Sequence, residues 1–84
     1  MSETIHEKAL RVYADVYDDT YFALREAKSP ATSQDRKAAS DEAAATARGV
    51  TRNEISQHRD RRQLTDGELE RIVSEAQDVH LTYA

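Results

Sequence analysis

Apolar residues recur three and four positions apart along much of this 84-residue chain, which is the spacing of a helix with one buried face. The clearest stripe lies between residues 3 and 27. Its apolar positions are Ile5, Ala9, Val12, Tyr13, Val16, Ala23, Leu24 and Ala27. The single proline of the chain, Pro30, follows in a polar segment that interrupts the helix. The pattern therefore predicts a long amphipathic helix over 3–27.

The next stretch, 34–48, is rich in alanine and carries no large apolar residue. Alanine is the strongest helix former, so a second helix is predicted here. Because its side chains are small, a neighbouring helix can approach closely, and we expect it to pack against Tyr13, Tyr17 and Tyr21 of the first helix. Tyrosines four residues apart could also form a stacking ladder for a ligand. Beside Val and Leu, they are more typical of a core and its rim.

A short pattern occurs at 50–55 and again at 64–69: an apolar residue, Thr, two further residues, Glu and a second apolar residue. In such a pattern the Thr hydroxyl accepts a hydrogen bond from the third helical N–H, and the Glu carboxylate accepts one from the Thr N–H. Each copy therefore predicts the start of a helix. Gly49 stands directly before the first copy, and glycine commonly closes a helix in the left-handed conformation. The sequence thus predicts a sharp turn at Gly49, a third helix over 52–62 and a fourth over 66–80.

These elements predict an all-α fold, a small bundle of four helices in a single domain, residues 1–84. Leu, Ile, Val and Phe together supply 14 of the 84 residues, about 17%, so the core is thin. The net charge of only −4 and the regular apolar spacing nevertheless favour a folded chain over a disordered one. Small domains often gain buried area by self-association, and we expect a homodimer.

Charge is distributed unevenly along the chain, which has 12 basic and 16 acidic residues in total. The segment 48–62 holds five arginines against two acidic residues, a local charge of +3. The segment 65–84 holds five acidic residues against Arg71 alone, a local charge of −4. Arginines on a short helix that begins at a tight turn are suited to phosphate contacts and to reading the major groove of DNA.

Residues 41–60 resemble the helix-turn-helix family of DNA-binding regulators. The resemblance rests on Ala45, Gly49, Val50, Thr51 and Ile55, with Ser56 following. In that family the small residue lets two helices cross closely, the glycine makes the turn, and the later apolar residues face the core. The resemblance implies a transcription regulator that binds double-stranded DNA through Arg48, Arg52, Asn53, Ser56, Gln57, Arg59, Arg61 and Arg62. Arg52, Asn53, Ser56 and Gln57 would face the groove, and the other arginines would hold phosphates.

Two other classes of function stay open from the sequence alone. A protein-binding regulator or inhibitor, of the type that phages and mobile elements encode, would use the acidic fourth helix or the Tyr-rich first helix to cover a partner. A structural oligomer subunit would need only exposed apolar stripes. In both cases the arginines would belong to an ordinary solvated helix face.

The sequence offers little for catalysis or for metal binding. His6, His58 and His80 are dispersed, and only Glu54 and His58 have a ligand spacing, which often arises by chance. Because the chain has neither a glycine-rich phosphate loop nor a nucleophile elbow, we expect no enzyme, no catalytic residue, no metal site and no cofactor. The absence of cysteine fits a reducing compartment, and no stretch is apolar enough to span a membrane. We therefore expect a cytoplasmic protein.

Overall fold

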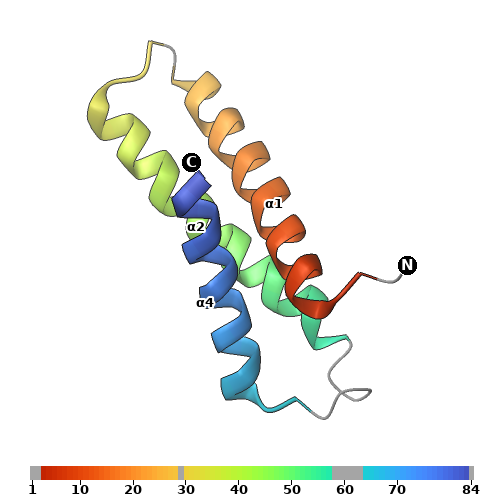
Figure 1. Cartoon of the computed structure of the whole chain (residues 1–84). Coiled ribbons are helices and arrows are strands. Elements are labelled where there is room, and N and C mark those ends of the chain that lie inside the picture. The colour runs from red at the N-terminus through yellow and green to blue at the C-terminus, as the bar shows by residue number, and fades with distance from the viewer. Residues whose placement is uncertain (1–2, 29, 58–63, 84) are drawn as a thin grey trace.

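The computed structural model describes residues 3–28, 30–57 and 64–83, and these residues form three helices. Helix α1 runs over Ile5–Ala27, α2 over Ser33–Ser56 and α4 over Asp66–Tyr83. α1 and α2 form an antiparallel hairpin, and α4 lies against the half of it that contains the start of α1 and the end of α2 (Figure 1). The other end of the hairpin projects beyond α4, and the molecule measures 46 × 26 × 20 Å. None of the three described helices is long and apolar enough to cross a membrane.

A threonine caps the start of each described helix. At α4 the Thr65 hydroxyl accepts a hydrogen bond from the Glu68 N–H at 3.2 Å, and the Glu68 carboxylate accepts one from the Thr65 N–H at 3.3 Å. The same reciprocal bonds are made by Thr4 with Glu7 at α1 and by Thr32 with Asp35 at α2. The helix starts predicted near residues 3 and 66 are therefore confirmed, and each has a local physical cause.

The all-α class is confirmed for the described part of the chain, but the predicted turn at Gly49 is wrong. A single helix, α2, replaces the predicted helices 34–48 and 52–62 as far as Ser56, and residues 58–62 lie outside the described residues. Buried positions of α2 recur at every fourth residue across the glycine without a change of face. They are Ala39, Ala43, Ala47, Thr51 and Ile55.

The relative sizes of two effects explain why the helix continues. A glycine inside a helix costs only about 1 kcal/mol relative to alanine. Burying a side chain such as that of Ile55, which is 0% exposed, contributes about 1.5–3 kcal/mol. A turn at Gly49 would rotate Thr51 and Ile55 out of the buried stripe, so packing outweighs the local preference for a helix end.

Thr51 consequently lies inside a helix and caps nothing. Its side chain is 0% exposed, and its hydroxyl has no hydrogen-bond partner among the described residues. The Glu54 carboxylate, which was expected to complete the cap, lies 3.9 Å from the Lys8 ammonium on α1. The same Thr-x-x-Glu pattern thus forms a helix cap at Thr65, whereas at Thr51 its threonine packs into the core.

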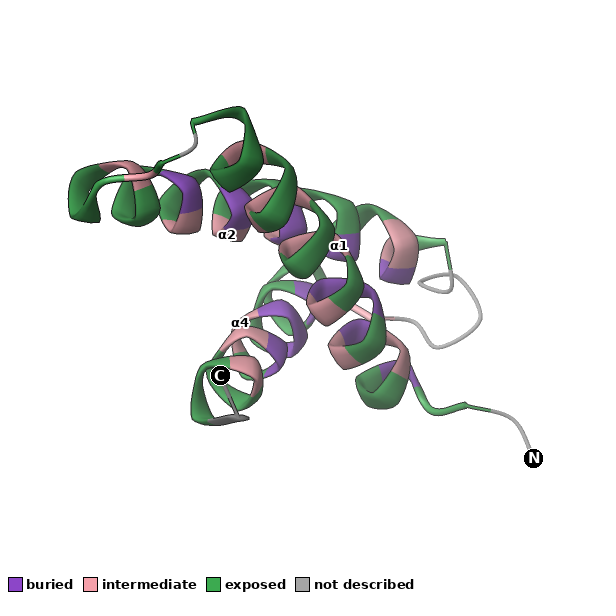
Figure 2. Ribbon diagram, turned by 90° about the horizontal axis from the view of Figure 1, so that it is seen from above, coloured by how far each residue is buried: buried purple, intermediate pink, exposed green. Residues whose placement is uncertain are grey.

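The core lies where the three helices meet (Figure 2). Its buried members come from every helix: Ile5, Ala9, Tyr13, Ala47, Ile55, Leu69, Ile72, Val73 and Ala76. As predicted, the alanine-rich helix packs against the tyrosines of α1, and the Tyr17 hydroxyl lies 2.7 Å from the Ser40 hydroxyl across that interface. Tyr13 is buried, Tyr17 is half-buried and Phe22 is 56% exposed, so the aromatic residues pass from core to rim along α1.

Candidate functional site

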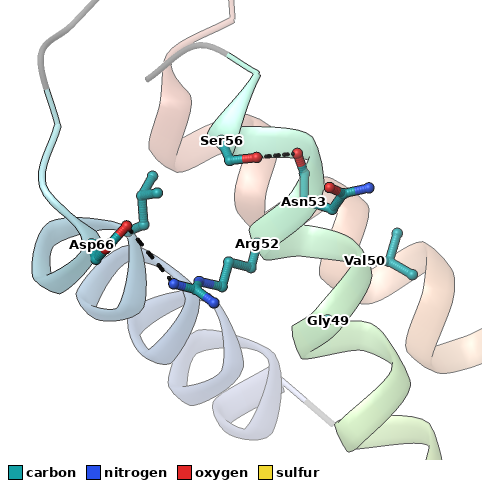
Figure 3. A pocket seen from close by; sticks show the side chains of 7 residues that line it. Gly49, Val50, Arg52, Asn53, Ser56 and Asp66 are labelled. Carbon is teal, nitrogen blue, oxygen red and sulfur yellow. Dashed lines mark hydrogen bonds and ion pairs between the residues drawn. The ribbon is translucent and has the colours of Figure 1, made fainter. Parts of the chain in front are cut away.

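The residues predicted to bind DNA lie along the second half of α2 and beyond its end. Arg48, Arg52 and Ser56 are spaced by four and lie on the side of α2 that faces α4. Asn53 points away from α4 (Figure 3), and Gln57 follows the helix as an exposed residue. The remaining predicted site residues, Arg59, Arg61 and Arg62, lie outside the described residues. The structure therefore brings Arg52, Asn53 and Ser56 to the lining of one hollow, described below, and does not bring Arg48 and Gln57 to it.

Two of these arginines join α2 to α4. The Nε atom of Arg52 lies 2.8 Å from Glu70 Oε1, and its Nη2 atom lies 3.9 Å from Asp66 Oδ1 (Figure 3). The Nη2 atom of Arg48 lies 3.6 Å from the second carboxylate oxygen of Glu70. Arg48 also donates hydrogen bonds to the side chains of Ser74 and Gln77. Both guanidinium groups are thus engaged within the molecule.

An open hollow of ≈ 480 Å³ lies beside Arg52, between the last two turns of α2 and the start of α4. It is lined by Gly49, Val50, Arg52, Asn53, Ser56, Asp66 and Leu69 (Figure 3). The Ser56 hydroxyl donates to the backbone carbonyl of Asn53 at 2.7 Å, so its donor is used within α2. The arginine in this hollow already faces carboxylates, which leaves little positive potential to attract a phosphate.

The described residues are acidic over most of the molecule. They include nine Lys and Arg against fifteen Asp and Glu, a net charge of −6. The hairpin end, residues 22–39, holds four of the basic and two of the acidic residues. The rest of the described chain therefore holds five basic and thirteen acidic residues, a net charge of −8. These described residues, taken alone, favour basic partners over the phosphate backbone of DNA, whereas residues 58–63, which lie outside the described residues, add three arginines and one aspartate.

A groove runs between α1 and α4, and no residue of α2 lines it. We call it the α1–α4 groove. Two hollows of ≈ 210 and ≈ 710 Å³ make it up and share His6, Ile72 and Glu75 as lining residues. Its floor is formed by the apolar side chains of Ile5, Leu10, Leu64, Ile72, Ala76 and Val79. Because Val79 is 37% exposed and Leu10 and Leu64 are only half-buried, apolar surface faces solvent along the groove.

Carboxylates dominate the rim of the α1–α4 groove. Glu7 stands on the α1 side, and Glu68 and Glu75 stand on the α4 side, all three exposed. Glu7 and Glu68 are also the capping residues of α1 and α4, so hydrogen bonds hold their carboxylates in place. The lining further includes Arg71 and His6, whose Nδ1 atom lies 3.4 Å from Glu75 Oε2. With His6 neutral, the lining carries three negative charges and one positive charge.

A cluster of rings fastens the last turns of α4 to α1. The His80 ring lies 4.6 Å from the Tyr17 ring and 5.4 Å from the Tyr13 ring, and its Nε2 atom lies 3.5 Å from Asp18 Oδ1. Burial raises the pKa of the Tyr13 hydroxyl.

In the part of the chain that the structure describes, no group of three His, Asp or Glu side chains could hold a metal ion. The spacing of Glu54 and His58 in the sequence, which is one that often arises by chance, cannot be compared with the structure, since His58 lies outside that part.

The hairpin end carries a further exposed hollow, of ≈ 710 Å³. Its lining combines the apolar side chains of Phe22, Pro30 and Ala31 with one basic residue, Arg25, and one acidic residue, Glu26. The positive charge of the arginine and the negative charge of the glutamate cancel. The lining of this hollow is therefore apolar without a net charge, unlike that of the α1–α4 groove.

The sequence pattern does not predict the α1–α4 groove, although it contains a signal for it. Leu10 stands beside the main stripe of α1, and Val79 stands one turn beyond the last buried residue of α4, Ala76. Each stripe is therefore wider than one neighbouring helix can cover, but only the packing of α1 on α4 places both residues on one surface.

A comparison with protein-family models, with curated proteins and with solved structures finds no match to this chain.

Proposed function

We propose that this protein is a regulator that binds another protein through the acidic surface of α4 and the adjoining side of α1. The observation that carries this proposal is the engagement of Arg48 and Arg52 with α4. These arginines neutralise Glu70 on the side of α4 that faces α2. The carboxylates of Glu75 and Asp78 remain exposed on α4, where a basic partner could reach them.

DNA binding, which the resemblance to helix-turn-helix regulators implies, has less support. The recognition helix of such a regulator follows a turn, whereas α2 passes through Gly49 without one. Phosphate contacts at Arg48 and Arg52 would have to replace their ion pairs with α4. A contribution from Arg59, Arg61 and Arg62 stays a prediction.

A homodimer also stays a prediction, and the charge distribution limits the surfaces that could form it. Two copies that met through the α1–α4 groove would bring two acidic rims together, and like charges at an interface oppose association. A dimer of this chain would therefore have to use another surface, such as the hairpin end around Phe22.

A capture experiment distinguishes protein binding from DNA binding. The immobilised protein is offered duplex DNA fragments and, separately, a cell lysate, each at about 0.05 and 0.15 M salt. We expect retention of a basic protein, and we expect the variant Glu75→Lys/Asp78→Lys to lose it. The control variant Asp41→Lys/Glu42→Lys makes the same change of charge on α2 and should retain the partner.

Two results of the capture experiment would contradict the proposal. Retention of DNA without any protein, weakened by Arg52→Ala and more strongly by added salt, would contradict the proposal and support a DNA-binding regulator. Capture of a protein that is unaffected by Glu75→Lys/Asp78→Lys would contradict the role of the acidic surface of α4.

A further inference from the structure

The walls of the α1–α4 groove restrict what kind of segment it can hold. Both walls are α-helices, whose backbone N–H and C=O groups bond within each helix. The groove therefore offers side chains and no free strand edge to which an extended peptide could add. A bound segment has to satisfy its own backbone groups, and an α-helix does this without help from the groove.

The floor of the groove sets the length and pattern of its occupant. Along α4 the lining extends over the twelve residues from Glu68 to Val79, about 17 Å of helix. A bound helix of similar length makes about three turns. Apolar side chains at positions i, i+4, i+7 and i+11 of that helix span about 17 Å and would follow the apolar floor, whose exposed parts include Leu64, Leu10 and Val79. Such a helix would be the fourth member of a bundle with α1, α2 and α4.

The rim of the groove sets the charge of its occupant. Glu7 and Glu68 are held by their own caps, and Glu75 stands between the two hollows. We infer that the α1–α4 groove binds an amphipathic helix of the partner protein, with its apolar face on Leu10 and Val79 and with Lys or Arg on both flanks. This inference rests on the proposed function, since it names the segment by which the partner is held.

Two other occupants agree less well with the same observations. In a second copy of this chain, α4 is acidic, and the basic residues gather at the hairpin end, where residues 22–39 carry a net charge of +2. Those basic residues are divided between α1, α2 and the connection between them, so they do not flank the apolar face of one helix. The hollow at the hairpin end is also apolar, but its lining contains one basic residue, Arg25, and one acidic residue, Glu26, and therefore does not select a charged partner. Charge complementarity therefore favours a basic helix from another protein.

A matched pair of synthetic peptides tests the inference directly. Both are helices of 15 residues, about four turns, with Leu at i, i+4, i+7 and i+11 and Ala between. One carries Lys on both flanks, and the other carries Glu at the same positions. Fluorescence anisotropy at about 0.05 M salt measures their binding to the whole protein. We expect the Lys peptide to bind at least about 10-fold more tightly than the Glu peptide.

Substitutions of two equally exposed side chains, one inside the groove and one outside it, locate the binding surface. Val79 in the groove and Val50 on α2 are both 37% exposed, so Val79→Lys and Val50→Lys place the same charge at equally accessible positions. We expect Val79→Lys to weaken the Lys peptide about 10-fold and Val50→Lys to change its binding by less than about 2-fold. Glu75→Lys should weaken it as well, whereas Glu42→Lys should not. Glu7 and Glu68 are left unchanged because they cap helices.

A measurement on the wild-type protein avoids any dependence on the folding of variants. Amide chemical shifts recorded by NMR during titration with the Lys peptide should change at Leu10, Ala76 and Val79. Those of Phe22 and Ala31 at the hairpin end should not change. Shifts centred on the hairpin end, or on the hollow beside Gly49, would assign the peptide to another surface and overturn the inference.

The failure of this inference and the failure of the proposed function give different results. If the Lys peptide binds no more tightly than the Glu peptide, or if Val50→Lys weakens it as much as Val79→Lys, the groove assignment is wrong. Capture of a basic protein that depends on Glu75 and Asp78 would still support the proposed function in that case. If the immobilised protein retains only DNA, the proposed function is wrong as well.

Discussion

At Gly49 the sequence pattern predicts the end of a helix, whereas the structure has a continuous helix. One substitution distinguishes these two conformations. A Cβ atom added at Gly49 meets no other side chain or neighbouring helix within 4 Å, and the residue lies inside α2. Gly49→Ala should therefore raise the free energy of unfolding by about 0.5–1 kcal/mol, because alanine has less freedom to lose on folding. Urea denaturation followed by circular dichroism measures this change.

The control for Gly49 lies one turn earlier on α2. Ala45 is also exposed, and Ala45→Gly should lower the free energy of unfolding by a similar amount. A Gly49→Ala variant less stable than the wild type would mean that Gly49 adopts the left-handed conformation of a helix end. That result would support the turn that a helix-turn-helix requires at this position.

Thr51 carries a buried hydroxyl that has no hydrogen-bond partner among the described residues. Valine has nearly the same shape without the hydroxyl, so Thr51→Val removes a buried polar group and leaves no cavity. We expect the free energy of unfolding to rise by about 1 kcal/mol, as measured by thermal or urea denaturation. Thr51→Ala, which also removes a methyl group, should be less stable than Thr51→Val. A destabilising Thr51→Val would indicate that the hydroxyl is hydrogen-bonded.

At the scale of elements, the structure has three of the four helix starts that the sequence predicts, and it lacks the predicted break at Gly49. Thr65 with Glu68 and Thr51 with Glu54 share one local pattern, but only the first forms a cap. Thr51 stands on a stripe of buried residues that continues on both sides of it, whereas Thr65 begins one. Whether that stripe is buried depends on α1 and α4, which lie far away in the sequence. Local spacing alone therefore cannot decide between a cap and a core position.

The candidate site is less predictable than the fold for a related reason. The sequence places Arg48 at the end of one predicted helix and Arg52 at the start of the next, whereas both lie on the single helix α2. Their ion pairs depend on where α4 places Glu70, which no local pattern encodes. The groove between α1 and α4 likewise arises from two apolar stripes that become one surface only after packing.

The cap of α2 leads to a dependence of stability on pH. Hydrogen bonds with the Thr32 backbone and side chain, and more weakly the charge of Lys28, lower the pKa of the Asp35 carboxyl from its ordinary value of 3.8. Because the pKa is lower in the folded state, the contribution of this carboxylate is complete above about pH 3.8. It is lost as the pH falls through the folded value. Asp35→Asn should remove this part of the acid sensitivity.

Substitution of the capping threonine tests the same element. Thr32→Ala should lower the free energy of unfolding by about 1 kcal/mol, since it leaves a helix N–H without its partner. An NMR titration should show the pKa of Asp35 rising toward 3.8 in that variant. The variant keeps the backbone N–H of residue 32, so an unchanged pKa of Asp35 would mean that the Thr32 side chain does not lower it.

At the scale of the whole molecule, a single small core holds three helices together. On the α2 side of the α1–α2 interface the buried residues are mainly alanines, which contribute little apolar area each. The larger side chains Leu69, Ile72 and Val73 come from α4 and complete the core from the open side of the hairpin. The hairpin therefore depends on α4, and we expect the molecule to unfold as one unit.

Leu69→Ala tests this dependence, because Leu69 is 1% exposed at the centre of the core. The substitution should cost about 2–5 kcal/mol, a large share of the roughly 4–13 kcal/mol typical of a chain of this length. Hydrogen exchange measured by NMR should then show lower protection in α1 and α2 as well as in α4. The matched control is Leu81→Ala on the same helix, where the side chain is 61% exposed and the change should be within about 0.5 kcal/mol. If amides of α1 and α2 kept their protection while α4 exchanged freely, the hairpin would be stable alone, and α4 would be an attached helix whose place on the hairpin another helix could take.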